Sequence, residues 1–149
     1  MHHATLALLL SITGLAASVA VGAEREPQTF LGEYKSPKKV CFPGPKGDWS
    51  ECEDAFDSLR LSRTENQQGR NIRIQAEFVF TNGHLCSFDG VGFWNRVDRV
   101  LAFDNESGCE LVLVVAQQRL HTVVLKPDQC KEHCGMRGSL DGLVLQKVR

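Results

Sequence analysis

The densest group of potential metal ligands lies near the C-terminus, in the segment Cys130-Lys131-Glu132-His133-Cys134. Thiolate and imidazole groups are preferred zinc ligands, so this segment could supply three of them, with His121 as a fourth. The same two cysteines are equally able to form disulfides with other cysteines of the chain. Which chemistry applies depends on the compartment in which the chain folds.

Residues 1–23 predict a secretory signal peptide. The apolar run from Leu6 to Val21 ends next to Gly22 and Ala23, which signal peptidase accepts, and no charged side chain precedes Glu24. An uncleaved membrane anchor is the alternative. The run is short for a membrane span and is interrupted by four small or hydroxyl residues, Ser11, Thr13, Gly14 and Ser18. We therefore expect a periplasmic or secreted protein with no membrane span after cleavage.

The six cysteines of an exported chain are expected to form three disulfides, because that compartment is oxidising. This expectation leaves no metal site, and nothing in the sequence indicates a cofactor. The first two cysteines flank a short Pro- and Gly-rich loop that a disulfide closes easily. A hairpin within residues 109–125 places the fourth cysteine opposite a residue just before the fifth, which leaves the third for the sixth. The predicted pairs are Cys41–Cys52, Cys109–Cys130 and Cys86–Cys134.

Catalytic motifs are scarce. The chain has no Gly-x-Ser-x-Gly nucleophile segment and no His-Glu-x-x-His metalloprotease segment, and paired cysteines leave no free thiol. His84 and His121, together with Asp89, would form an acid–base set if folding brought them together. We favour a structural interpretation, in which His84 packs at a turn and His121 lies on an outer strand face.

The segment from Val91 to Asn95 contains two adjacent aromatic residues, Phe93 and Trp94, next to a glycine. If this loop is extended, neighbouring side chains point to opposite faces, so a single sheet face cannot bury both rings. One ring could therefore be exposed as a binding contact, and the alternative, which we favour, is that the rings pack in the core or at a barrel end. Arg137, between two glycines, is a further candidate, either as an anion-binding side chain or as a structural cap.

Most of the chain that would position these residues predicts β-strands. Residues 24–51, which include Cys41, show no sustained period and predict an extended lead-in. Residues 50–56 predict a short helical turn. Residues 70–80 alternate strictly between apolar and polar side chains, the pattern of a half-buried strand. Asn82-Gly83 follows and suits a tight turn, so a hairpin is expected over residues 75–95.

Residues 58–62 also predict a strand, because Leu59 and Leu61 alternate with polar side chains, and further strands are predicted at four places. Residues 97–103 form one, and residues 120–125 and 140–148 form two more. Residues 109–116 are apolar at nearly every position, which suits either a central strand or a strand covered on both faces, and residues 120–125 return beside them. About seven short strands with turn signals predict an all-β domain over residues 52–149. We expect a small antiparallel barrel or sandwich stapled by disulfides, with the barrel favoured because it removes exposed edges.

The charge of the chain excludes one class of partner. Its formal net charge is −1, with 17 basic and 18 acidic side chains, all of which lie after residue 23. A nucleic-acid-binding protein needs a clustered basic face to neutralise phosphates, so no nucleic-acid partner is expected.

Two segments, residues 80–90 (Phe-Thr-Asn-Gly-His-Leu-Cys-Ser-Phe-Asp-Gly) and residues 130–142 (Cys-x3-Cys-Gly-Met-Arg-Gly-Ser-Leu-Asp-Gly), are distinctive. Together they resemble a group of small exported bacterial domains, mostly uncharacterised, some of which occur beside lysozyme-inhibitor-like modules. The resemblance covers roughly residues 59–148. It implies a periplasmic β-domain with paired cysteines.

These observations favour a non-enzymatic binding or inhibitory module that acts on an envelope protein, with a lysozyme-like glycosidase as one candidate partner. The expected contacts are the loop from Val91 to Asn95, through Phe93 and Trp94, and Arg137. The alternatives are a carrier that holds a small ligand inside a barrel and a small hydrolase that uses histidine acid–base residues. The sequence does not predict an oligomeric state.

Overall fold

The computed structural model describes residues 30–49, 51–67, 70–80, 84–95, 100–104, 107–135 and 138–148. The predicted signal peptide, the Asn82-Gly83 turn and Arg137 lie outside these residues. The described strands are β1 (Gly32–Phe42), β2 (Glu51–Gln67), β3 (Arg70–Val79), β4 (Leu85–Asn95), β5 (Val100–Asp104), β6 (Glu110–Ala116), β7 (Arg119–Val124) and β8 (Val144–Lys147). A short helix α1 (Pro127–Cys130) and a 3-10 helix η3 (Lys131–His133) separate β7 from β8.

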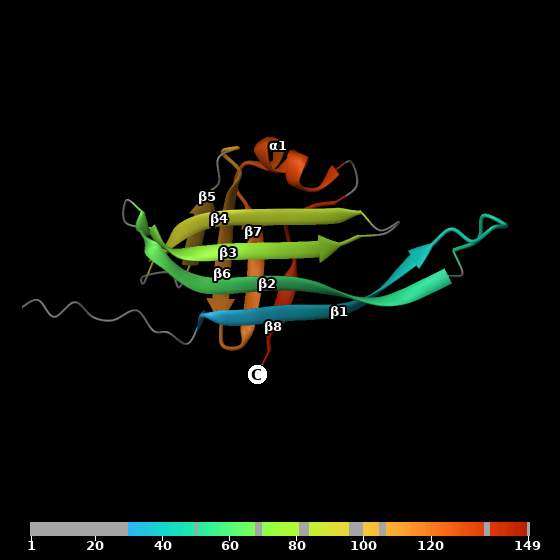
Figure 1. The fold of residues 1–149 in the computed structure, drawn as a ribbon, viewed down its shortest axis with the longest axis horizontal. Helices are drawn as coiled ribbons and strands as arrows, with labels where there is room; N and C mark the ends of the chain where they lie inside the picture. The colour runs from blue at the N-terminus through green and yellow to red at the C-terminus, as the bar shows by residue number, and fades with distance from the viewer. Residues whose placement is uncertain are drawn as a thin grey trace, which may run out of the picture.

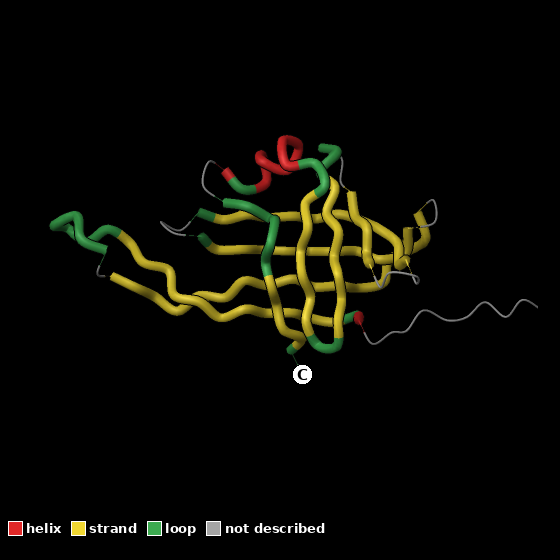
Figure 2. The backbone as a smooth tube through the Cα atoms, turned by 180° about the vertical axis from the view of Figure 1, so that it is seen from behind, coloured by secondary structure: helices red, strands yellow, loops and turns green. Residues whose placement is uncertain are grey.

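The strands form one closed antiparallel barrel in sequence order, from β1 to β8. Each strand pairs with its neighbours in the chain, and β1 also pairs with β8 through Tyr34 and Lys147 and through Lys35 and Gln146. Strands β1–β4 cross the front of the molecule in Figure 1, and Figure 2 shows the later strands running across them from behind. The predicted all-β, disulfide-stapled fold is confirmed, and the architecture is the barrel.

The predicted lead-in and helical turn are wrong for the described residues between 32 and 56. Gly32–Phe42 is strand β1, and it pairs with β2 over its whole length, from Gly32 opposite Leu61 to Phe42 opposite Glu51. Lysines and a proline obscure the strand pattern in the sequence, because side chains facing water need not be apolar. Residues 51–56 are extended because pairing with β1 satisfies backbone groups that a single helical turn would leave unpaired.

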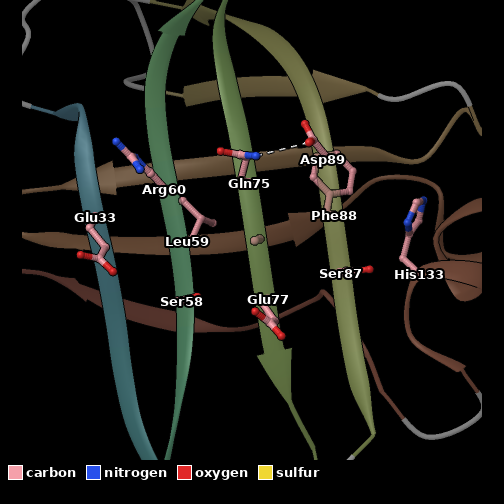
Figure 3. Close-up of a pocket in the computed structure, with 11 residues that line it drawn as sticks. Glu33, Ser58, Leu59, Arg60, Gln75, Glu77, Ser87, Phe88, Asp89 and His133 are labelled. Carbon is pink, nitrogen blue, oxygen red and sulfur yellow. Dashed lines mark hydrogen bonds between the residues drawn. The ribbon is translucent and has the colours of Figure 1, made fainter.

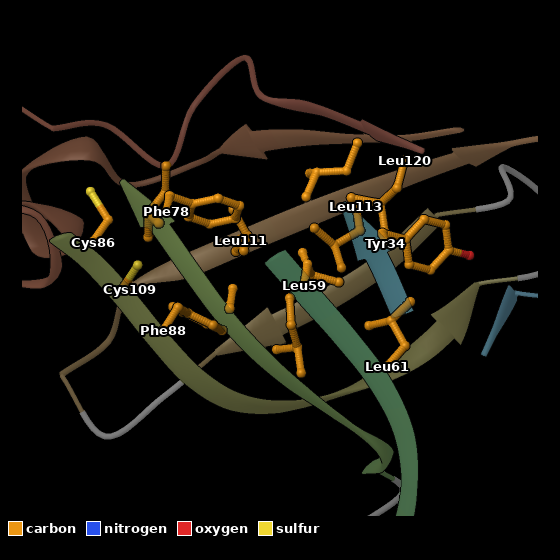
Figure 4. Close-up of a cluster of buried hydrophobic side chains, with 14 of the residues drawn as sticks. Tyr34, Leu59, Leu61, Phe78, Cys86, Phe88, Cys109, Leu111, Leu113 and Leu120 are labelled. Carbon is orange, nitrogen blue, oxygen red and sulfur yellow. The ribbon is translucent and has the colours of Figure 1, made fainter. Parts of the chain in front are cut away.

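The barrel interior is filled by the apolar side chains of alternate strand positions (Figure 4). The alternation predicted for β3 is confirmed, with Ile72, Ile74, Ala76 and Phe78 all buried. Burial of such a side chain contributes about 1.5–3 kcal/mol. Across the other strands the largest fully buried side chains are Tyr34, Leu59, Leu61, Phe88, Leu111, Leu113 and Leu120.

Strand β6 is a central strand between β5 and β7, the first of the two predicted alternatives, and its two faces are not equally buried. Leu111, Leu113 and Val115 are buried, but Val112 and Val114 between them are only partly buried. In a single-layered barrel wall, one side of each strand faces the interior and the other faces outward. The continuous apolar run of β6 therefore places valines on the outer surface.

The three disulfides are Cys41–Cys52, Cys86–Cys134 and Cys109–Cys130, the same pairs that the sequence predicts. The last two attach the segment containing α1 and η3 to β4 and to the start of β6. Each bridge contributes roughly 2–4 kcal/mol, chiefly by restricting the unfolded chain. Three disulfides indicate a protein that folds outside the cytoplasm.

The β1–β2 hairpin extends well beyond the rest of the barrel (Figures 1 and 2). Within the described residues, the pairing of β1 with β8 ends at Lys35, and the pairing of β2 with β3 begins at Ser58. We call residues 36–57, with Ser50 outside the described residues, the arm. The Cys41–Cys52 disulfide joins directly opposed residues near its tip.

Candidate binding surface

The outer face of β1–β4 carries a row of polar side chains that crosses all four strands. Glu33 lies opposite Arg60, Arg60 opposite Gln75, and Gln75 opposite Asp89. Side chains of directly paired residues lie on the same face of a sheet, so the four form one continuous ladder. They point outward because Tyr34, Leu59, Ala76 and Phe88, their neighbours in sequence, point into the core.

Asp89 is held in place by charged and polar neighbours on β3. Arg73 Nε donates to its Oδ1 at 2.9 Å and Arg73 Nη2 to its Oδ2 at 2.6 Å. Gln75 Nε2 donates to Oδ2 at 3.4 Å (Figure 3). The hydrogen bonds and charge of Arg73 lower the pKa of Asp89 despite an opposing effect of partial burial. The carboxylate is therefore ionised and oriented at neutral pH, with its acceptor sites largely used.

A shallow hollow of about 650 Å³ lies over this row (Figure 3). A second row lines it beside the first, formed by Ser58, Glu77 and Ser87, which are paired across β2, β3 and β4. The hollow thus presents carboxylates, hydroxyls, an amide and one guanidinium group. Such a surface suits polar contacts with a partner and is too open to enclose a small molecule.

His133 lies at the edge of the hollow (Figure 3). Its Nε2 is 3.0 Å from Ser107 Oγ, and its ring packs edge-on against Phe88 at 5.7 Å between centroids. Ser107 and His133 belong to the same two segments that the Cys109–Cys130 disulfide joins. These two contacts of His133 therefore reinforce the attachment of η3 to the barrel wall.

Two separate pairs of apolar side chains, together called the apolar row, border the polar rows on the side of the arm. Pro37 lies opposite Phe56, and Val79 lies opposite Leu85, on the same outer face. Phe56 is 56% exposed and Leu85 is 52% exposed. Exposed aromatic and large aliphatic side chains beside polar groups are typical of protein-binding surfaces.

Comparison of the chain with protein-family models, curated proteins and solved structures finds no match. The resemblance to exported bacterial domains stays a prediction. No helix among the described residues has both the length and the apolar character needed to cross a membrane.

The predicted binding residues Phe93 and Trp94 lie within strand β4 and not in a loop, which corrects the sequence interpretation of Val91 to Asn95. Strand geometry sends them to opposite faces, as expected. Phe93 points outward and is 47% exposed, whereas Trp94 packs against the core and stacks on Phe30 at 4.4 Å between centroids. Trp94 is therefore a structural residue.

The structure does not bring His84, His121 and Asp89 together. His121 projects from β7 and Asp89 from β4, and β5 and β6 lie between these strands in the barrel. Three strand spacings correspond to roughly 14 Å along the wall. Cys130 and Cys134 are both disulfide-bonded, and no cluster of three potential metal ligands occurs among the described residues.

The polar and apolar rows are the part of the surface that sequence reasoning missed. Alternation within β3 does indicate that Gln75 and Glu77 point outward. It does not show which residues of β1, β2 and β4 lie beside them. The sequence predicts a helical turn at residues 50–56, and this prediction does not reveal the exposure of Phe56 on a strand.

Proposed function

We propose that this protein is a binding or inhibitory module that acts on another protein outside the cytoplasm. The contact surface is the outer face of β1–β4, with its hollow and its apolar row. The observation that carries the proposal is the exposure of Phe56 and Leu85 beside the polar hollow on one face of a disulfide-braced sheet. Rigid display of an aromatic anchor beside polar groups lowers the entropic cost of association.

The barrel interior offers less support for the alternative of a small-ligand carrier. Tyr34, Phe78 and Phe88 are among the side chains that occupy it, and all three are almost completely buried. A carrier of this barrel size needs small or absent inward side chains to leave room for its ligand. The hollow of about 650 Å³ lies on the outer face of the wall.

The candidate partner is an envelope or secreted enzyme, and a lysozyme-like glycosidase is the specific candidate that the sequence resemblance suggests. A projecting two-stranded arm braced by a disulfide has a shape that can enter the cleft of an enzyme. Export by an N-terminal signal peptide, followed by residence in the periplasm or secretion, is part of this proposal.

The test uses a photo-crosslinking amino acid in place of single outward side chains in the oxidised protein. Substitution at Phe56 or Leu85 is expected to capture one partner from an envelope fraction, whereas substitution at Val123, which is 40% exposed on β7, captures none. A purified lysozyme, assayed by clearing of a cell-wall suspension, tests the specific candidate.

Matched surface variants measure how much each exposed side chain contributes to binding of the partner. Phe56→Ser and Leu85→Ser are each expected to weaken binding of the captured partner about tenfold or more, the effect of losing an interface anchor. Val123→Ser is the control and leaves binding unchanged. Capture from Val123 alone, or full binding by both the Phe56 and the Leu85 variants, would show that the proposed surface is wrong.

A further inference from the structure

The hydrogen-bonding direction of β1 can be read from a single contact. The backbone N–H of Val148 donates to the C=O of Glu33 at 2.8 Å, on the side of β1 that faces β8. In an antiparallel strand, backbone groups of alternate residues point to opposite edges. Odd-numbered residues of β1 therefore point away from β2, and even-numbered residues form the ladder with β2.

The uninterrupted register between β1 and β2 extends this alternation to the arm. Val40 lies opposite Glu53 and Lys38 opposite Ala55, so Glu53 and Ala55 form the ladder with β1. The residues that alternate with these two are Cys52, Asp54 and Phe56. Their backbone N–H and C=O groups point to the other edge of β2, away from β1.

Strand β3 does not cover this edge. Its pairing with β2 reaches Ser58 opposite Glu77, and the next donor along β3 is the N–H of Val79. That N–H donates to the side-chain Oδ1 of Asp57 at 2.9 Å, where a continued ladder would use the C=O of Phe56. The carboxylate ends the β2–β3 ladder and leaves the free edge of β2, defined as Cys52, Asp54 and Phe56, without a described strand partner.

The opposite edge of the arm is protected, and this contrast is informative. The backbone nitrogen of Pro37 on β1 points to the edge that faces away from β2. Because proline has no N–H, Pro37 breaks no hydrogen bond between β1 and β2, and it offers no donor to a strand that approaches the outer edge of β1. Lys39 adds a charge on the same edge. Proline and lysine are the common protection of an edge strand against pairing. The free edge of β2 has no proline and retains its donors and acceptors.

The charges on β2 indicate which kind of strand can pair with its free edge. Glu51, Glu53 and Asp54 are exposed on this strand, and the Asp54 side chain is 79% exposed, with Lys39 Nζ no closer than 3.9 Å. A second copy that paired through the same edge would set acidic side chains against acidic side chains, which is unfavourable. A cationic strand would be complementary, and an apolar residue of that strand would contact Phe56.

We propose that the free edge of β2 receives an extended, lysine- or arginine-bearing segment of the partner protein as an added antiparallel strand. This inference rests on the proposed binding function and specifies how part of the partner is recognised. Main-chain hydrogen bonds supply affinity in this mode, and alternate side chains supply specificity.

The probe is a short blocked peptide of alternating lysine and threonine, with a glutamate–threonine peptide as its matched control. Residue-resolved hydrogen exchange of the oxidised protein is expected to slow at the amides of Cys52, Asp54 and Phe56 when the lysine peptide binds. The amides of Glu53 and Ala55, already bonded to β1, should not change. Simple electrostatic adsorption would not reproduce this alternation, so equal slowing at both sets of amides, or no slowing, overturns the proposal.

A pair of proline variants supplies a second readout. Asp54→Pro removes one N–H from the free edge of β2, and Lys39→Pro removes one from the opposite edge at the directly paired position. The first should weaken peptide binding about tenfold or more, while the second leaves it within about twofold. Asp54→Asn, which keeps the N–H, should be intermediate. Equal binding by the two proline variants contradicts the proposal.

The same variants separate this inference from the proposed function. A partner whose binding is lost with Phe56→Ser or Leu85→Ser, but kept with Asp54→Pro, would support the binding surface and refute strand addition. Retained binding in all three variants would refute both.

Discussion

The carboxylate of Asp57 accepts a hydrogen bond of 2.9 Å from the backbone N–H of Val79, at the point where β2 and β3 separate. The same oxygen lies 2.6 Å from Lys38 Nζ, and the Asp57 side chain is almost completely buried. One side chain thus satisfies the last donor of β3 and pairs with a lysine of β1. The arm begins at this residue, where the β2–β3 ladder ends.

Replacement of Asp57 by Ala is expected to destabilise the protein by about 1.5–3 kcal/mol, the usual loss for a hydrogen bond to a charged group. The variant leaves the Val79 N–H and the Lys38 ammonium without this partner. Chemical denaturation with the disulfides intact measures the change. Asp54→Ala is the control, since Asp54 is exposed and its separation from Lys39 is 3.9 Å, and it should change stability by less than about 0.5 kcal/mol. Equal effects of the two variants would contradict the role of Asp57.

Tyr34 gives a direct prediction for alkaline pH. Burial raises the pKa of Tyr34 from an ordinary value of 10.0 to about 12, and its hydroxyl donates to the C=O of Phe30 at 2.6 Å. Because the folded state favours the neutral phenol, this stabilisation is complete below about pH 10 and is lost as the pH rises towards 12. Tyr34 is the only tyrosine in the chain, so the ultraviolet absorbance of tyrosinate reports on it alone.

The expected titration is a single transition near pH 12 in the folded protein, which moves to about pH 10 in denaturant. A folded-state transition near pH 10 would show that the phenol is exposed. Tyr34→Phe should abolish the absorbance change and remove this contribution to the alkaline loss of stability.

Gly138 is required by close packing against a disulfide. A Cβ atom at this position would lie 2.5 Å from Cys86 Sγ and 3.0 Å from the backbone oxygen of Cys134. Gly138→Ala is therefore expected to destabilise the oxidised protein by about 1–3 kcal/mol, the typical cost of overpacking. Thermal or denaturant unfolding measures it.

The control for Gly138 repeats the substitution in a Cys86→Ala/Cys134→Ala background, which removes the sulfur atoms. The cost of Gly138→Ala should fall there, because its nearest neighbour is gone, and the difference measures the coupling between the two sites. An unchanged cost would assign the effect to the backbone of residue 138.

Asp89 predicts a small loss of stability in acid. Its pKa lies below the ordinary value of 3.8, first because of the hydrogen bonds from Arg73. A carboxyl group with a lowered folded-state pKa stabilises the fold above its unfolded pKa, and the contribution is lost as the pH falls through the folded value. The side chains of Arg73 and Asp89 are about half exposed. Their ion pair therefore contributes about 0.2–1 kcal/mol to the free energy of unfolding, and this contribution decreases as the salt concentration rises.

The check is the pH dependence of unfolding below pH 4 for the wild type and for Arg73→Gln. The variant should lose less stability on acidification than the wild type, and the difference should shrink at high ionic strength. Identical pH profiles would indicate that the Arg73–Asp89 contact makes no net contribution.

Much of the fold could be predicted from local patterns. The strict alternation of β3 predicted which side chains are buried, and loop length together with the β6–β7 hairpin predicted the disulfide partners of Cys41 and Cys109. The strand β1 could not be predicted, because Pro37 and the neighbouring lysines mask its period. These residues suit a strand whose outer edge and outer face are in water, a circumstance that only the neighbouring strands reveal.

The amino-acid sequence by itself determined the strand content, the pairing of cysteines and the opposite directions of Phe93 and Trp94, because each follows from periods of two and from short loops. The tertiary structure alone decided that Glu33, Arg60, Gln75 and Asp89 form one row and that Asp57 ends the β2–β3 ladder. Those relationships depend on the register of each pair of consecutive strands, which the pattern within a single strand does not set. Register is set by how all eight strands together bury one core.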